Sequence, residues 1–232
     1  MNSRVILVSD DRSSLRSPDT LLWPDAACMR GIHTGEWTAH IFEYAMSFEG
    51  NMTQVRELAA ANGVGVLHPH GALATDPPGL IVCDVDSTVT RTEAIDLLAE
   101  CAGNADEVRE ITARAMVGEL DFTQSLYARV RCLEGLHIGA LEEAWKATVI
   151  TPGTAELVAA AHDVGAAVGL VSGGFTAIVD PLAEQIRADF AASNELEIVD
   201  NHLTGRVVGD IIARAAQATW LRRWASAGGV AP

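Results

Sequence analysis

Two aspartates separated by one residue are the clearest candidates for chemistry in this 232-residue chain. Asp84 and Asp86 stand in the string Asp-Val-Asp-Ser-Thr at 84–88, directly after the apolar run 80–83. Two carboxylates this close in a turn repel each other unless a divalent cation lies between them or one of them holds a proton. Such a pair suits a nucleophile and a general acid/base that share Mg²⁺. A solvated acidic turn that caps the following helix is the alternative interpretation.

A serine followed by two glycines is the second candidate. Ser172 and Gly173 follow another apolar run, 167–171, and precede a predicted helix. Glycines let the backbone approach a phosphate, and a hydroxyl together with the free amides of a helix N-terminus binds it. Ser-Gly-Gly is a common loop by itself. In combination with the two aspartates, across a helical insertion, it predicts a phosphate site.

The elements around these motifs indicate how they are brought together. Each motif follows a strand and precedes a helix, and this alternation predicts a parallel sheet with ligands at the carboxyl ends of its strands. Helical periodicity fills the insertion between the motifs, and a helix follows from 151. The remaining chain predicts a helix to about 187, a strand at 190–193, a hairpin over 197–208 with Asp200 and Asn201 at its turn, and a helix at 212–225.

A Pro- and Gly-rich segment, 68–79, predicts a linker between two domains. We place a small α+β domain at 1–75 and the main domain at 76–232. The first domain has predicted strands at 4–9, 38–48 and 64–67 and a helix at 53–61, with an irregular segment at 13–35. His68 and His70 are interpreted either as a metal site or as part of the linker loop.

Composition excludes several classes of function. The 16 basic and 31 acidic residues give a net charge of −15, which argues against nucleic acid or an anionic membrane as partner. The chain has no apolar stretch of 18 residues, and its N-terminal apolar run is too short for a signal peptide. The four cysteines form no Cys-x-x-Cys pair, so free thiols in a reducing compartment are expected. We expect a soluble, cytoplasmic protein.

The string at 84–88 and the string Ser-Gly-Gly-Phe-Thr at 172–176 resemble the motifs of the phosphoserine phosphatase family of the haloacid dehalogenase superfamily. The resemblance begins at Gly79. It implies an α/β fold with a three-layer, Rossmann-like parallel sheet and a helical cap at about 92–148. It also implies Mg²⁺-dependent hydrolysis of O-phospho-L-serine in serine biosynthesis, with Asp84 as nucleophile, Asp86 as acid/base and both as metal ligands.

The resemblance extends to residues that would bind the substrate. Ser172 and Gly173 match the residues that hold the phosphoryl group, Glu93 the acid that contacts the substrate ammonium, and Arg129 the arginine that holds its carboxylate. Two apolar cap residues that close the pocket are matched by Met116 and Phe122. Each has an alternative: Glu93 as the third residue of a capping box that begins at Thr90, Arg129 as a solvated helix residue, and the apolar pair as core.

Two departures from the family pattern are visible. Gln217 stands where the family places a lysine that steadies the phosphoryl charge, and the chain ends at Pro232, before the strand and acidic loop that complete the metal site. We therefore expect a C-terminally incomplete sheet with an unpaired edge beside Asp84, which invites a homodimer. These departures favour an alternative function: an impaired remnant or fragment that binds phosphoserine or a partner chain without turnover. A related phosphatase of different specificity is a third hypothesis. The first domain resembles, in position and size, an ACT-like regulatory domain.

Overall fold

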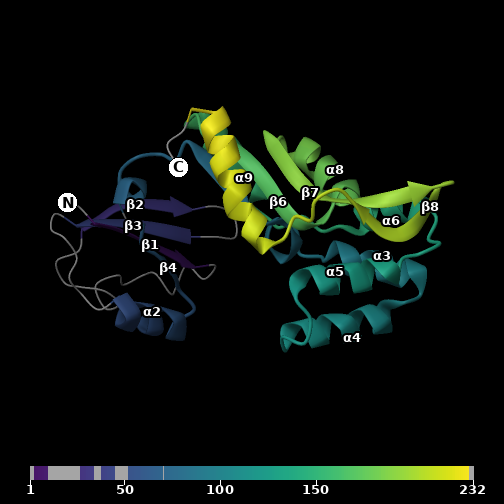
Figure 1. Cartoon of the computed structure of the whole chain (residues 1–232). Helices are drawn as coiled ribbons and strands as arrows, with labels where there is room; N and C mark the ends of the chain where they lie inside the picture. The colour runs from purple at the N-terminus through teal and green to yellow at the C-terminus, as the bar shows by residue number, and fades with distance from the viewer. Residues whose placement is uncertain (1–2, 10–26, 34–37, 45–51, 70, 230–232) are drawn as a thin grey trace. The chain divides into compact units, whose positions relative to one another are not determined.

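The computed structural model describes residues 3–9, 27–33, 38–44, 52–69 and 71–229. The chain divides into two compact units, Met1–Pro77 and Pro78–Pro232 (Figure 1). In the described ranges, no helix combines the length and the apolar character needed to cross a membrane.

The first unit is an antiparallel sheet with one described helix. Its strands are β1 (Ser3–Ser9), β2 (Ala27–His33), β3 (Thr38–Tyr44) and β4 (Gly65–Leu67), in the order β2-β3-β1-β4, and the helix is α2 (Met52–Ala61). The predicted α+β class is confirmed. The prediction that 13–35 is irregular is wrong for β2, whose pairing with β3 is interrupted by a bulge between Cys28 and Arg30 that obscures the strand periodicity. His70 lies outside the described residues.

A mixed sheet forms the centre of the second unit. Its strands are β5 (Leu80–Cys83), β6 (Ala167–Phe175), β7 (Phe190–Val199) and β8 (His202–Val208), hydrogen-bonded in that order. The first two pairings are parallel, as predicted, and β7 and β8 form an antiparallel hairpin. The other edge of β5 pairs with no strand among the residues that the structure describes. Asp200 and Asn201 form the hairpin turn with φ of 50° and 61°, which confirms the predicted turn.

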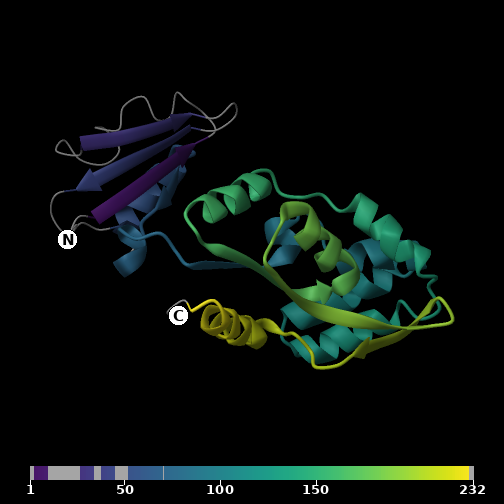
Figure 2. The same ribbon diagram turned by 90° about the horizontal axis from the view of Figure 1, so that it is seen from above.

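Helices cover both faces of this sheet, which confirms the three-layer fold (Figure 2). The helices α7 (Thr154–Asp163) and α8 (Thr176–Ile186) pack on one face against Val168 and Leu170 of β6. On the opposite face, α9 (Arg214–Ala227) packs Trp224 against Val171. Successive side chains of β6 therefore point to opposite faces of the sheet, and both faces are buried.

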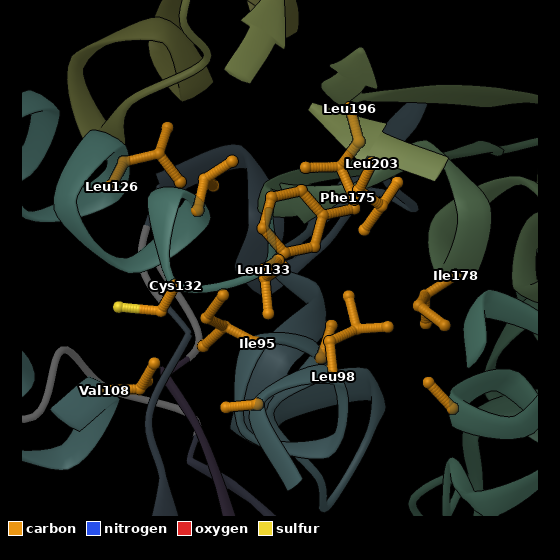
Figure 3. Close-up of a cluster of buried hydrophobic side chains, with 14 of the residues drawn as sticks. Ile95, Leu98, Val108, Leu126, Cys132, Leu133, Phe175, Ile178, Leu196 and Leu203 are labelled. Carbon is orange, nitrogen blue, oxygen red and sulfur yellow. The ribbon is translucent and has the colours of Figure 1, made fainter. Parts of the chain in front are cut away.

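The cap consists of helices between β5 and β6. They are α3 (Ala94–Ala102), α4 (Ala105–Met116), α5 (Phe122–Arg131) and α6 (Gly139–Ala147). Their apolar faces meet in a cluster that includes Leu98, Val108 and Leu133, together with Phe175 from the end of β6 (Figure 3). Because Phe175 belongs to a strand and the others to the cap, this cluster fixes the cap on the carboxyl end of the sheet.

The β7–β8 hairpin also joins the cap through backbone hydrogen bonds. The amide of Gly135 donates to the carbonyl of Leu203 at 2.8 Å, and the amide of Leu203 donates to the carbonyl of Leu136 at 2.8 Å. A third bond, 3.0 Å long, runs from the amide of Ile138 to the carbonyl of Asn201. The segment between α5 and α6 is therefore tied to the hairpin by main-chain bonds, which do not depend on side-chain identity.

Candidate active site

A cavity of about 530 Å³ lies where β5 and β6 end beneath the cap. It is lined by polar and charged residues from the strand ends and by charged and apolar residues from the cap: Asp84, Asp86, Glu93, Ile95, Phe122, Leu126, Arg129, Gly173, Gly174, Phe175 and Gln217. Both motifs that the sequence singled out therefore open into the same space. This is the position at which open α/β sheets place their ligands.

Asp86 is held by one hydrogen bond on each carboxylate oxygen. The amide of Ala94, the first residue of α3, donates to Oδ1 at 2.9 Å, and the hydroxyl of Ser172 donates to Oδ2 at 2.9 Å. The tight turn at 85–89, with Ser87 at φ 55°, folds the chain back so that Asp86 reaches this helix terminus. Asp86 therefore caps α3, as the alternative interpretation expected, and lines the cavity at the same time.

Asp84 is the more accessible carboxylate. It lies at the end of β5 and accepts a hydrogen bond on Oδ1 from Nε2 of Gln217, at 3.3 Å. Partial burial raises the pKa of Asp84, the backbone amide of Val85 lowers it, and the charge of Asp86 raises it again. The net effect is a raised pKa, with burial as its largest cause.

The glycine segment at 173–174, which we call the glycine loop, lies at the end of β6, and other groups approach it closely. A Cβ at Gly174 would lie 2.5 Å from Oδ2 of Asp86, and one at Gly173 would lie 2.7 Å from the ring of Phe122. Ser172 itself is fully buried and stands behind the cavity wall: its hydroxyl donates to Asp86 and accepts the amide of Gly174 at 2.7 Å. Gly174, the second glycine of the predicted phosphate motif, lines the cavity together with Gly173.

Glu93 and Arg129 place opposite charges in the cap side of the cavity. Oε1 of Glu93 accepts the hydroxyl of Ser87 at 2.5 Å, and burial, as the largest cause, raises the pKa of this carboxyl. Arg129 is half-buried, and burial lowers the pKa of its guanidinium, whereas the charges of Glu93, Asp96 and Asp86 favour its charged form. Nε of Arg129 donates to the carbonyl of Ser125 at 3.3 Å, and its side chain lines the cavity within electrostatic range of these acidic residues.

The capping-box alternative for Glu93 is wrong. Helix α3 begins at Ala94, so Glu93 is its N-cap residue and not its third residue. The hydroxyl of Thr90 donates to the carbonyls of Val85 and Thr92, at 3.2 and 2.9 Å, and caps no helix amide. The side chain of Glu93 is thereby left for the cavity.

The two predicted apolar cap residues lie in different places. Phe122 lines the cavity over Gly173. Met116 does not: its side chain is 84% exposed and borders a neighbouring depression that Phe122 and Arg129 share. The cavity's apolar wall is made instead by Ile95, Leu126 and Phe175. The signal for Leu126 was its spacing, since residues four after Phe122 and three before Arg129 lie on the same helix face.

The oxygens at the strand ends suit a hard cation. No group of three or more His, Cys, Asp or Glu side chains that could hold a metal ion occurs within the ranges described above. Asp84 and Asp86, however, present carboxylate oxygens to one cavity. Mg²⁺ binds through one or two carboxylates, substrate phosphate oxygens and water, so this donor set fits it.

Comparison with known proteins gives the family. Residues 81–231 match the haloacid dehalogenase-like hydrolase family. The chain is 49% identical over 172 residues to a phosphoserine phosphatase of Streptomyces coelicolor, covering 74% of this chain and 42% of that protein. It is 46% identical over 152 residues to a phosphoserine phosphatase of Streptococcus thermophilus, covering 66% of this chain and 71% of that protein. The chain thus spans less than half the length of the first of these relatives.

A solved structure extends the similarity to the fold. The unliganded crystal structure of a probable phosphoserine phosphatase from Vibrio cholerae matches 98% of this chain and 70% of its own, with 32% identity and a TM-score of 0.78. The sequence match and the fold agree with a site built from two aspartates and a glycine loop at the strand ends. This chain belongs to the haloacid dehalogenase-like hydrolase family.

Proposed function

We propose that this chain hydrolyses O-phospho-L-serine to L-serine and phosphate, as part of serine biosynthesis. The observation that carries the proposal is the pair of opposite charges, Glu93 and Arg129, in the same cavity as the two aspartates. A phosphorylated amino acid has an ammonium, a carboxylate and a phosphate. The cavity offers a carboxylate for the first, a guanidinium for the second and the glycine loop for the third.

The chemistry is a double displacement at phosphorus. Asp84 attacks phosphorus while the bond to the seryl oxygen breaks, and that oxygen takes a proton from Asp86. The product of this step is an aspartyl phosphate on Asp84 together with free serine. Asp86 then removes a proton from a water molecule that attacks the same phosphorus, which releases phosphate and restores the carboxylate of Asp84.

Other residues of the cavity position the reactants. The loop at Gly173 and Gly174 brings backbone close to the phosphoryl oxygens, and Phe122 covers this loop and excludes water. Asp84 and Asp86 would hold Mg²⁺, which supplies neutralisation of the phosphoryl charge when bound. Gln217 offers a hydrogen-bond donor beside Asp84 but no charge.

The test is phosphate release from O-phospho-L-serine by the purified chain with millimolar Mg²⁺. We expect release by the native chain and a loss of about 10⁴-fold or more in Asp84→Asn, which retains the size of the side chain but not its nucleophilicity. Asp121→Asn, which changes an aspartate that caps α5 outside the cavity, is the matched control and should retain activity.

A binding remnant is the second candidate, and Gln217 is the observation that favours it, because a neutral amide stabilises phosphoryl charge less than a lysine would. It predicts that folded native chain releases no more phosphate than Asp84→Asn but still binds O-phospho-L-serine in calorimetry. A phosphatase of different specificity would release phosphate, and Arg129→Ala would leave its activity on phosphoserine unchanged.

Three further assignments are part of the proposal. A regulatory, ACT-like role for residues 1–75 is supported by the antiparallel sheet with a helix in the first unit. A homodimer is supported by the free edge of β5 within the described strands. A cytoplasmic location is supported by the free thiols of Cys83, Cys101 and Cys132.

A further inference from the structure

We propose that Asn194, on β7, is a positioning residue that orients both aspartates of the site. Its side chain is 1% exposed and does not line the cavity, so it contacts no substrate. Its amide instead connects the glycine loop to the segment that leads into α9. The catalytic consequence rests on the proposed phosphatase function, whereas the structural consequence does not.

The amide of Asn194 uses its donors and its acceptor on two separate segments. Nδ2 donates to the carbonyl of Gly173 at 2.9 Å and to the carbonyl of Ile212 at 3.3 Å, and Oδ1 accepts the amide of Ile212 at 2.8 Å. These partners lie 21 and 18 residues away in the sequence. The bonds fix which end of the side chain is nitrogen, because both carbonyls require a donor.

The hydrogen bond from Asn194 to Gly173 is connected, through the next residues, to Asp86. The carbonyl of Gly173 and the amide of Gly174 belong to the same peptide group, which is planar. Asn194 holds its oxygen, and the hydroxyl of Ser172 accepts its N–H at 2.7 Å. That hydroxyl then directs its own hydrogen to Oδ2 of Asp86 at 2.9 Å. Rotation of this peptide would therefore release the serine hydroxyl and free one oxygen of Asp86.

The hydrogen bonds from Asn194 to Ile212 are connected, through the start of α9, to Asp84. Both backbone groups of Ile212 are bound by Asn194, and α9 begins at Arg214. Gln217 lies in the first turn and a half of that helix, and its Nε2 donates to Oδ1 of Asp84 at 3.3 Å. The position of the helix start relative to β7 therefore sets the distance between this amide and the nucleophile.

Asparagine is required here because the site needs two donors and one acceptor in a buried space. The substitution Asn194→Asp would keep an acceptor for the amide of Ile212, but it would place a carboxylate against two carbonyl oxygens. Leaving buried carbonyls without donors is unfavourable, so the peptide of Gly173 is expected to turn away. Asn194 is not part of the cavity lining, so an effect of this substitution on catalysis has to pass through its hydrogen-bond partners.

The experiment compares Asn194→Asp with Asn104→Asp, by steady-state kinetics on O-phospho-L-serine and by crystallography of each variant. Asn104 is a matched control, because its Nδ2 also donates to a distant carbonyl, that of Cys132 at 2.7 Å, in the cap and away from the cavity. For Asn194→Asp we expect kcat to fall about 10- to 100-fold with KM changed less, and the Ser172 Oγ to Asp86 Oδ2 distance to exceed about 3.5 Å. For Asn104→Asp we expect kcat within about twofold of native and the bond retained.

A double-mutant cycle separates positioning from general destabilisation. If Asn194 acts through Ser172, the loss of kcat in Asn194→Asp combined with Ser172→Ala is smaller than the product of the two single losses. If Asn194 has a purely structural role, the loss of kcat in the double variant equals the product of the two single losses. Unchanged kcat in Asn194→Asp, or an undisturbed bond to Asp86 in its crystal structure, overturns the proposal while phosphate release by the native chain still supports the phosphatase.

Failure of the phosphatase function would be seen separately, as absence of phosphate release by the native chain, and the crystal structures would then decide the positioning role alone. If Asn194→Asp does not fold, Asn194→Ser is crystallised instead, with the same increase expected in the distance from Ser172 Oγ to Asp86 Oδ2.

Native protein supplies a test that needs no variant. Both Nδ2 protons of Asn194 should exchange slowly with solvent in NMR spectra, and fast exchange overturns the network.

Discussion

The floor and the roof of the cavity are built by different means. The floor, formed by Asp84, Asp86, Gly173 and Gly174, consists of short side chains and backbone at strand ends. Its parts are joined by hydrogen bonds, and the contact between Gly174 and Asp86 leaves no room for an added carbon. The roof, formed by Glu93, Phe122, Leu126 and Arg129, consists of longer side chains from the cap. Under the proposed function, backbone geometry at the strand ends positions the reacting groups, whereas the longer cap side chains select the substrate.

Apart from the loss of the nucleophile in Asp84→Asn, the largest effect is expected from a change in the floor at Gly174. Gly174→Ala introduces a Cβ that would lie 2.5 Å from Oδ2 of Asp86, so either the loop or the carboxylate must move. We expect kcat to fall about 100-fold, measured by phosphate release. Gly65→Ala, whose new Cβ would meet its nearest atom at 3.5 Å in the first unit, is the control. Native-like turnover in Gly174→Ala would show that the reaction tolerates displacement of the glycine loop or of Asp86, and would contradict this prediction.

A change in the roof should alter selection more than chemistry. Arg129→Ala removes the guanidinium that we propose to bind the substrate carboxylate, and kcat/KM for O-phospho-L-serine should fall about 10- to 100-fold. O-phosphoethanolamine lacks this carboxylate, so its kcat/KM should change less than about threefold. Arg131→Ala, an exposed arginine of the same helix, serves as control. Equal losses on both substrates would show that Arg129 contributes to the chemical step and not to recognition of the carboxylate.

A positive charge added to the floor is expected to increase turnover. Gln217→Lys places a cation near Oδ1 of Asp84, where the native amide lies at 3.3 Å. A cation there stabilises the developing phosphoryl charge, so we expect kcat to rise by about three- to tenfold with a smaller change in KM. Lowered kcat in this variant would mean that the neutral amide is required.

The smallest effect concerns stability. Burial raises the pKa of Glu93, so the folded protein binds a proton more readily than the unfolded chain, and stability falls as pH rises through this range. Glu93→Gln removes this cost and still accepts the hydroxyl of Ser87. We expect its melting temperature at pH 7 to exceed that of the native chain by about 2 °C, and the difference to vanish as pH falls below the raised pKa.

The control for this stability prediction is Glu110→Gln, an exposed glutamate of α4, which should leave the melting temperature unchanged at every pH. Both scans are made in chelator-containing buffer, so that bound metal does not contribute. A difference for Glu93→Gln that grows with acidity would contradict the assigned sign of the pKa shift.

Local sequence predicted the parts of the site that follow directly from a strand. The apolar runs of β5 and β6 end at the two motifs, so the meeting of Asp86 with the glycine loop followed from the topology of parallel strands. The turn at Asp200 and Asn201 was similarly predicted from residues that tolerate positive φ.

Long-range contacts account for what the sequence did not reveal. Asn194 gives no local signal, since its partners are 18 and 21 residues away. Helical periodicity could not tell that Met116, at the end of α4, is exposed whereas Leu126 faces the cavity, because that depends on how the cap sits on the sheet. Strand β2 was missed because its bulge breaks the alternation on which strand prediction depends.

The backbone bonds between the hairpin and the cap have a consequence for how molecules reach and leave the cavity. Gly135, Leu136 and Ile138 are tied to Leu203 and Asn201 by main-chain bonds, so this side of the cap moves with the sheet. We expect any opening of the cap to take place at the opposite margin, where α4 and α5 are joined by residues 117–121, with the segment 135–138 as its fixed edge.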